Sequence, residues 1–71
     1  MPVEITAHIT GTVWKIQVAV GDRVAEEQSV VILESMKMEM PVESPAAGTL
    51  TAISVNEGQP VEEGDVLVTL G

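Results

Sequence analysis

One lysine stands out among the residues of this chain that could do chemistry. Lys37 lies at the middle of the 71 residues, in the segment Glu34-Ser35-Met36-Lys37-Met38-Glu39, and the only other lysine is Lys15. A buried lysine can lose its proton and act as a base or nucleophile, whereas a solvated lysine stays protonated near neutral pH. A solvated amine suits attachment of a group by a separate enzyme, which removes the proton inside its own active site.

The two methionines beside this lysine point to contact with other molecules. Met36 and Met38 would leave apolar surface uncovered at a loop tip, and such surface usually meets a partner. Methionine is also an adaptable residue, common on surfaces that bind several partners. Met40, two positions further on, is expected to face inward.

The remaining candidates favour structural roles. His8 is the only histidine and the chain has no cysteine, so we expect a surface histidine and no metal site. Asp22 and Asp65 follow glycines and are typical of turns. Trp14, the only aromatic residue, is expected in the core. No catalytic residues are predicted, because no phosphate-binding glycine loop, nucleophile elbow or zinc motif is present.

The net charge of the chain limits the classes of molecule that are expected to bind it. Eleven acidic residues against three basic ones give a net charge of −8. This field repels phosphate backbones and anionic membranes, so neither nucleic acid nor a membrane is expected as a partner. The acidity either steers the domain toward basic faces of partner enzymes or only keeps it soluble. With no cysteine, no apolar run of about 20 residues and no signal peptide, we expect a cytoplasmic protein. Met1 and Gly71 fit a complete small protein, but the sequence leaves open whether the chain is free-standing or part of a longer subunit.

The chain contains an internal repeat, in which one sequence motif occurs twice. A shift of 37 positions places residues 11–34 over residues 48–71 without a gap, and the identical pairs include Gly11/Gly48, Ile16/Ile53 and Leu33/Leu70. Residues 2–34 and 39–71 are therefore two halves of one domain, which covers residues 1–71. Between the halves lies a junction at residues 35–38, the centre of a predicted hairpin at residues 34–39.

Each half is predicted to be β-structure. Apolar residues alternate with polar ones, which indicates strands with one face turned inward; these residues are Val3, Ile5, Ala7, Trp14, Ile16, Val18, Val20, Val66, Val68 and Leu70. The run from Val30 to Leu33 is typical of a strand covered on both faces. Two such halves predict an all-β fold: a flattened barrel or sandwich of two antiparallel sheets related by a pseudo-twofold axis.

A tight hairpin at the junction would place Lys37 in water. A two-residue loop turns its central side chains, here Met36 and Lys37, away from both sheets. One turn of the repeat is expected to differ between the halves, because Glu27 lies over Gly64 and a left-handed backbone costs a non-glycine residue about 1–2 kcal/mol.

The central segment resembles the attachment motif of biotinyl domains, in which the pattern is Glu-Ala/Ser-Met-Lys-Met. The flanking Gly11-Thr12-Val13, Val20-Gly21-Asp22 and Ser44-Pro45-Ala46-Ala47-Gly48-Thr49 are similar to that family's turns. The resemblance covers the whole chain and is greatest to small free-standing biotin carriers, the biotin/lipoyl attachment proteins. It implies the barrel-sandwich hybrid fold of biotinyl and lipoyl domains, with biotin in amide linkage to Lys37.

The resemblance also implies roles and partners. Biotin protein ligase would install biotin, Met36 and Met38 would distinguish that ligase from the lipoyl ligase, and Glu34 would help recognition. The domain would then carry biotin between a biotin carboxylase and a carboxyltransferase, as in acyl-CoA carboxylases, without catalysing a reaction itself.

Two other functions stay open at the level of sequence. A lipoyl carrier has a similar fold, although lipoyl domains usually have Asp-Lys-Ala around the lysine. An unmodified β-domain could instead bind a partner through its methionine tip.

Overall fold

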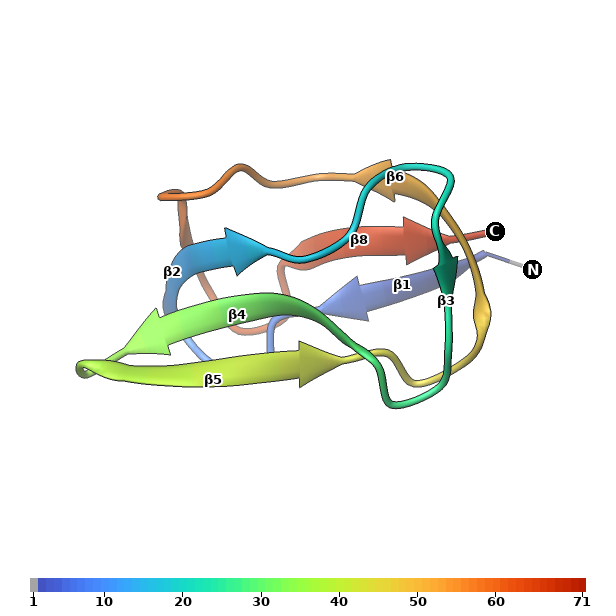
Figure 1. Cartoon of the computed structure of the whole chain (residues 1–71). Coiled ribbons are helices and arrows are strands. Elements are labelled where there is room, and N and C mark those ends of the chain that lie inside the picture. The colour runs from blue at the N-terminus through green and yellow to red at the C-terminus, as the bar shows by residue number, and fades with distance from the viewer. Residues whose placement is uncertain (1) are drawn as a thin grey trace.

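The computed structural model describes residues 2–71, which form eight β-strands in two four-stranded sheets (Figure 1). The strands are β1 (Val3–Thr6), β2 (Gly11–Ile16), β3 (Arg23–Val24), β4 (Ser29–Ser35), β5 (Met38–Glu43), β6 (Gly48–Ile53), β7 (Pro60–Val61) and β8 (Val66–Leu70). The sheet orders are β1-β8-β6-β3 and β5-β4-β2-β7, and every pairing is antiparallel. The predicted all-β fold of two antiparallel sheets is confirmed.

The repeat seen in the sequence relates the two sheets. Shifting β2 by 37 positions gives β6, and shifting β3 gives β7. The same shift exchanges the two strand orders, so β1-β8-β6-β3 becomes β5-β4-β2-β7. Each sheet contains strands from both halves of the chain. The halves are therefore interleaved, and neither could close its own sheet.

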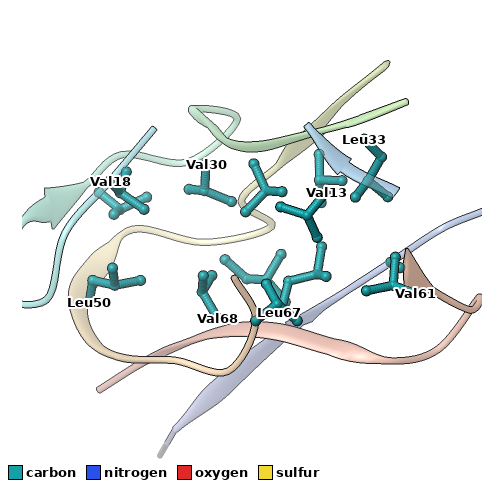
Figure 2. Packing of buried hydrophobic residues seen from close by; sticks show 14 of the residues in the cluster. Val13, Val18, Val30, Leu33, Leu50, Val61, Leu67 and Val68 are labelled. Atoms are coloured by element: carbon teal, nitrogen blue, oxygen red, sulfur yellow. The ribbon is translucent and has the colours of Figure 1, made fainter. Parts of the chain in front are cut away.

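The core follows the same symmetry. Within residues 2–71, every buried side chain has a buried counterpart 37 positions away, and the pairs are Ile5/Val42, Ala7/Ser44, Val13/Leu50, Val18/Val55, Val24/Val61, Val30/Leu67, Val31/Val68 and Leu33/Leu70. Figure 2 shows valines and leucines from both sheets meeting between them. Ser44 is the one buried polar residue of this set, and its hydroxyl donates a hydrogen bond to the Ala46 carbonyl. A core of branched aliphatic side chains suits two pleated sheets packed face to face.

The expectation that Trp14 and Val20 face inward was wrong, because both side chains are exposed, at 46% and 61%. A β-bulge between Val13 and Lys15 leaves Trp14 without a partner on β4. The bulge shifts the inward-facing positions by one residue, so Val13 is buried ahead of it and Trp14 turns outward. Val20 lies in the tight turn closed by the hydrogen bond from Asp22 N–H to the Ala19 carbonyl.

The expectation that the Glu27 turn differs from the Gly64 turn was also wrong. Both residues have positive φ, 70° for Glu27 and 94° for Gly64. The Glu27 N–H donates to the Ser44 carbonyl, and the Gly64 N–H donates to the carbonyl of Ala7, the counterpart of Ser44. The same hydrogen bonds hold both turns, and they maintain the left-handed backbone at Glu27 despite its cost.

Candidate functional site

The junction between the halves is a two-residue hairpin, as predicted. Ser35 at the end of β4 pairs with Met38 at the start of β5, and Met36-Lys37 forms the turn. Met36 and Lys37 both have positive φ, 53° and 64°. Two consecutive left-handed residues define the type I′ turn, whose twist matches that of the adjoining strands. The turn therefore holds the lysine at the apex, in a backbone conformation usually taken by Asn-Gly.

The hairpin projects from the end of the molecule opposite the chain termini (Figure 1). In the other sheet, the symmetry-equivalent position is where β1 and β8 pair through Val3 and Leu70, next to the two ends of the chain. The fold therefore presents one such connected tip, and Lys37 occupies it.

The base of the hairpin is held by a third strand. Thr12 of β2 pairs with Glu34 of β4, which in turn pairs with Glu39 of β5. A methyl group at Gly11 would lie 2.5 Å from the Glu34 carbonyl oxygen, so only glycine lets β2 pass this close. This role of Gly11 was not predicted from the sequence, although the identity of Gly11 and Gly48 in the repeat was a signal for it.

The side chains at the tip lie in solvent. Met36 is 92% exposed and Met38 is 60% exposed, and Lys37 between them is also exposed. The predicted exposure of this trio is confirmed. Met40 is half-buried opposite Leu33, so the prediction that it faces inward is confirmed in part.

The charges at the hairpin are unequal. Glu34 and Glu39 are exposed and lie directly opposite each other across β4 and β5, whereas Lys37 is the one cation of residues 34–39. Like charges in this position repel by a few tenths of a kcal/mol. An acyl group on the Lys37 amine would remove its positive charge and leave the two carboxylates. Modification of this lysine therefore makes the tip, which already has an excess of one negative charge, more negative still.

The other sequence candidates lie away from this tip. His8 is exposed, and it lines a surface groove with Glu4, Thr6 and Glu43 between β1 and β5. Within residues 2–71 no three His, Asp or Glu side chains are grouped to hold a metal ion. Asp22 and Asp65 accept hydrogen bonds from backbone N–H groups three residues earlier, as turn residues do. No helix in the described part of the chain is long and apolar enough to cross a membrane.

Comparisons with known proteins identify relatives of this chain. The family model described as "Biotin-requiring enzyme" matches residues 1–70. A biotin carboxyl carrier protein from Streptococcus mutans is 48% identical over 64 residues, which are 90% of this chain and 49% of that protein. A biotin/lipoyl attachment protein from Bacillus subtilis is 41% identical over 66 residues, 93% of this chain and 90% of that one.

A solved structure gives the same result for the fold. The urea carboxylase of Kluyveromyces lactis matches with a TM-score of 0.94 and 34% identity, covering all of this chain and 6% of the larger one. The chain thus spans about half of the Streptococcus relative, nine tenths of the Bacillus relative and a small part of a carboxylase.

Proposed function

The chain belongs to the family of biotin-requiring enzymes, and from this premise we propose that it is a biotin carrier whose attachment residue is Lys37. The observation that carries the proposal is the geometry of the tip. A single exposed amine lies at the apex of a type I′ turn, at the one connected end of a duplicated fold.

The residues of the tip suit the covalent attachment and carriage of biotin. Lys37 would form an amide with the carboxyl group of biotin, and the oxygen that this carboxyl group loses would leave with AMP when ATP is split into AMP and pyrophosphate. Bound biotin supplies a ring nitrogen that accepts and gives up a carboxyl group. The protein contributes position, because paired strands hold the hairpin while the long lysine arm swings from it.

A biotin protein ligase would read Glu34, Met36 and Met38 around the lysine, and it would deprotonate the amine in its own site. The loaded tip would then visit a biotin carboxylase and a carboxyltransferase, in the cytoplasm. Tethering keeps the carried group at an effective concentration of order millimolar at both sites. The names of the relatives, biotin carboxyl carrier protein and urea carboxylase, support these partners.

The test compares the two lysines. The wild-type protein, Lys37→Arg and Lys15→Arg are each incubated with biotin, ATP and a biotin protein ligase, and their intact masses are measured. Lys15 is exposed on β2 and keeps its own charge as arginine, so it is a matched control. One biotin per chain on wild type and Lys15→Arg, with none on Lys37→Arg, supports the proposal. Equal labelling of Lys37→Arg and wild type contradicts it.

Lipoyl attachment is the second candidate, favoured by the name of the Bacillus relative, a biotin/lipoyl attachment protein. The same amine could form an amide with lipoic acid. A parallel incubation with lipoate and a lipoyl ligase gives a mass increase of lipoyl size if the tip accepts both groups. No increase with either ligase would point to an unmodified domain that binds through its methionine tip.

A further inference from the structure

The repeat provides an internal comparison of the two outer faces of the molecule. Positions related by the 37-residue shift have the same backbone setting, so a difference in side chain is not required by the fold. The core shows almost no such differences in character. The outer faces of the two sheets do differ, and three related positions are apolar on one face and polar on the other.

That row is apolar on the sheet that forms the hairpin. Trp14 is the unpaired residue of the β2 bulge, the next residue Lys15 lies opposite Ile32 of β4, and Ile32 lies opposite Pro41 of β5. Trp14 is 46% exposed, Pro41 is exposed and Ile32 is half-buried. We call Trp14, Ile32 and Pro41 the Trp14 row.

The equivalent row on the other sheet is polar. Thr51 takes the place of Trp14 in the same bulge, Thr69 takes the place of Ile32, and Glu4 takes the place of Pro41. The fold therefore accepts polar side chains at all three positions. The Trp14 row exposes apolar surface, on the hairpin sheet alone, that nothing inside the chain requires.

Carboxylates lie on both sides of the Trp14 row. Glu34 and Glu39, paired across β4 and β5, lie between the row and the tip, and Glu43 lies opposite Ser29 on the far side. All three are exposed. A second copy of this chain would bring the same carboxylates and a net charge of −8 against them, so self-association through this face is disfavoured. The exposed amine of Lys15, opposite Ile32, offsets one of these three carboxylates, so the surface keeps a net negative charge and complements an apolar patch flanked by arginine or lysine.

We propose that the Trp14 row is a docking surface for the biotin protein ligase, through a ligase surface with an apolar centre and flanking basic side chains. The inference rests on the proposed function, since it assumes that a ligase closes over Lys37. The ligase must bring its active site to the Lys37 amine itself, whereas the later partners meet a group at the end of the lysine arm, so a surface close to the hairpin suits the ligase best. Met36 lies four positions beyond Ile32 along the chain, about 13 Å of strand at roughly 3.3 Å per residue. An interface of about 800 Å² per partner has a radius of about 16 Å, so one centred near the hairpin includes the row.

The kinetic test replaces a residue of one half of the repeat by its counterpart in the other half. Trp14→Thr installs the residue found at Thr51 in the equivalent bulge, so folding is retained. We expect the KM of the ligase for the apo protein to rise about tenfold or more, with kcat within about twofold, because an exposed tryptophan is a typical binding hot spot remote from the reacting amine. Trp14→Phe should recover most of the loss.

The matched control is Val20→Glu, which removes a second exposed apolar side chain and installs its own counterpart, Glu57. Val20 lies in a turn whose Gly21 N–H donates a hydrogen bond to the Leu50 carbonyl of β6, in the other sheet. Because this turn is outside the Trp14 row, the KM of the ligase for Val20→Glu should stay at the wild-type value. Equal KM values for wild type and Trp14→Thr would overturn the inference, even if Lys37 is biotinylated. A failure of the proposed function would be distinct, because wild type itself would then gain no biotin.

A second measurement needs no variant. Trp14 is the only tryptophan, so the ¹⁵N-labelled apo protein gives one indole N–H resonance. Adding unlabelled ligase should shift or broaden this resonance together with those of residues 34–39. If the residues of the hairpin respond and the indole does not, the Trp14 row lies outside the interface and the inference fails.

Discussion

At the scale of residues, the tip depends on two side chains that occupy an unusual backbone conformation. Met36 and Lys37 take the left-handed region, where Asn and Gly are usual. Left-handed conformations cost non-glycine residues about 1–2 kcal/mol each. Strain of this kind is often found at functional sites. Here the two strained positions carry a methionine side chain and an amine at the apex of the turn, whereas glycine would carry no side chain.

The exposed methionines should matter for recognition and hardly at all for folding. Replacing Met36 by Asp together with Met38 by Ala should change the free energy of unfolding, measured in urea, by no more than about 0.5 kcal/mol. Biotin attachment by the ligase should slow markedly. Met40→Ala is the matched control: the Met40 side chain is half-buried opposite Leu33, so its removal should lower stability and leave the attachment rate nearly unchanged. A loss of several kcal/mol in the double variant would mean that the tip methionines are packed.

At the scale of elements, turns and bulges decide which side chains the strands present. The strand positions and the hairpin follow from the sequence, because alternation and the 37-residue repeat locate them without tertiary information. The Val13/Lys15 bulge does not follow, since one inserted residue reverses the inward face without breaking the apolar pattern. For that reason Trp14 was predicted in the core. Its counterpart Thr51 is polar, and this difference was a signal in the sequence that the position faces outward.

The Glu27 turn allows a test of left-handed strain. Glu27→Gly should raise the free energy of unfolding by about 0.5–1 kcal/mol, because relief of the left-handed cost exceeds the added freedom of glycine in the unfolded chain. Gly64→Ala should lower it by a similar amount. A Cβ atom at Gly64 would have no atom within 4 Å, so its effect is purely conformational. If urea titrations show that the two substitutions change the free energy of unfolding in the same direction, the two turns are not equivalent in strain.

At the scale of the whole molecule, duplication explains both the rigidity and the single tip. The two halves exchange strands, so each sheet needs both halves. The backbone connection between the halves creates one projecting hairpin at one end and leaves the chain termini at the other (Figure 1). The sequence was sufficient to predict this arrangement. It could not show the difference between the two outer faces, which depends on the bulge and on the cross-strand register.

Interleaved sheets should unfold together. Leu33→Ala and Leu70→Ala remove counterpart side chains that are at most 1% exposed, one from each sheet. Each should lower the free energy of unfolding by about 2–5 kcal/mol, within a single transition followed by both circular dichroism and Trp14 fluorescence. Separate transitions for the two signals, or a negligible effect of one substitution, would mean that the sheets are independent.

The site of attachment is the most direct test of the proposed carrier function. Wild-type protein biotinylated by the ligase is digested, and the modified peptide is identified by tandem mass spectrometry. We predict biotin on Lys37 alone, with Lys15 unmodified in the same sample. Biotin on Lys15, or on any residue other than Lys37, would contradict the proposal.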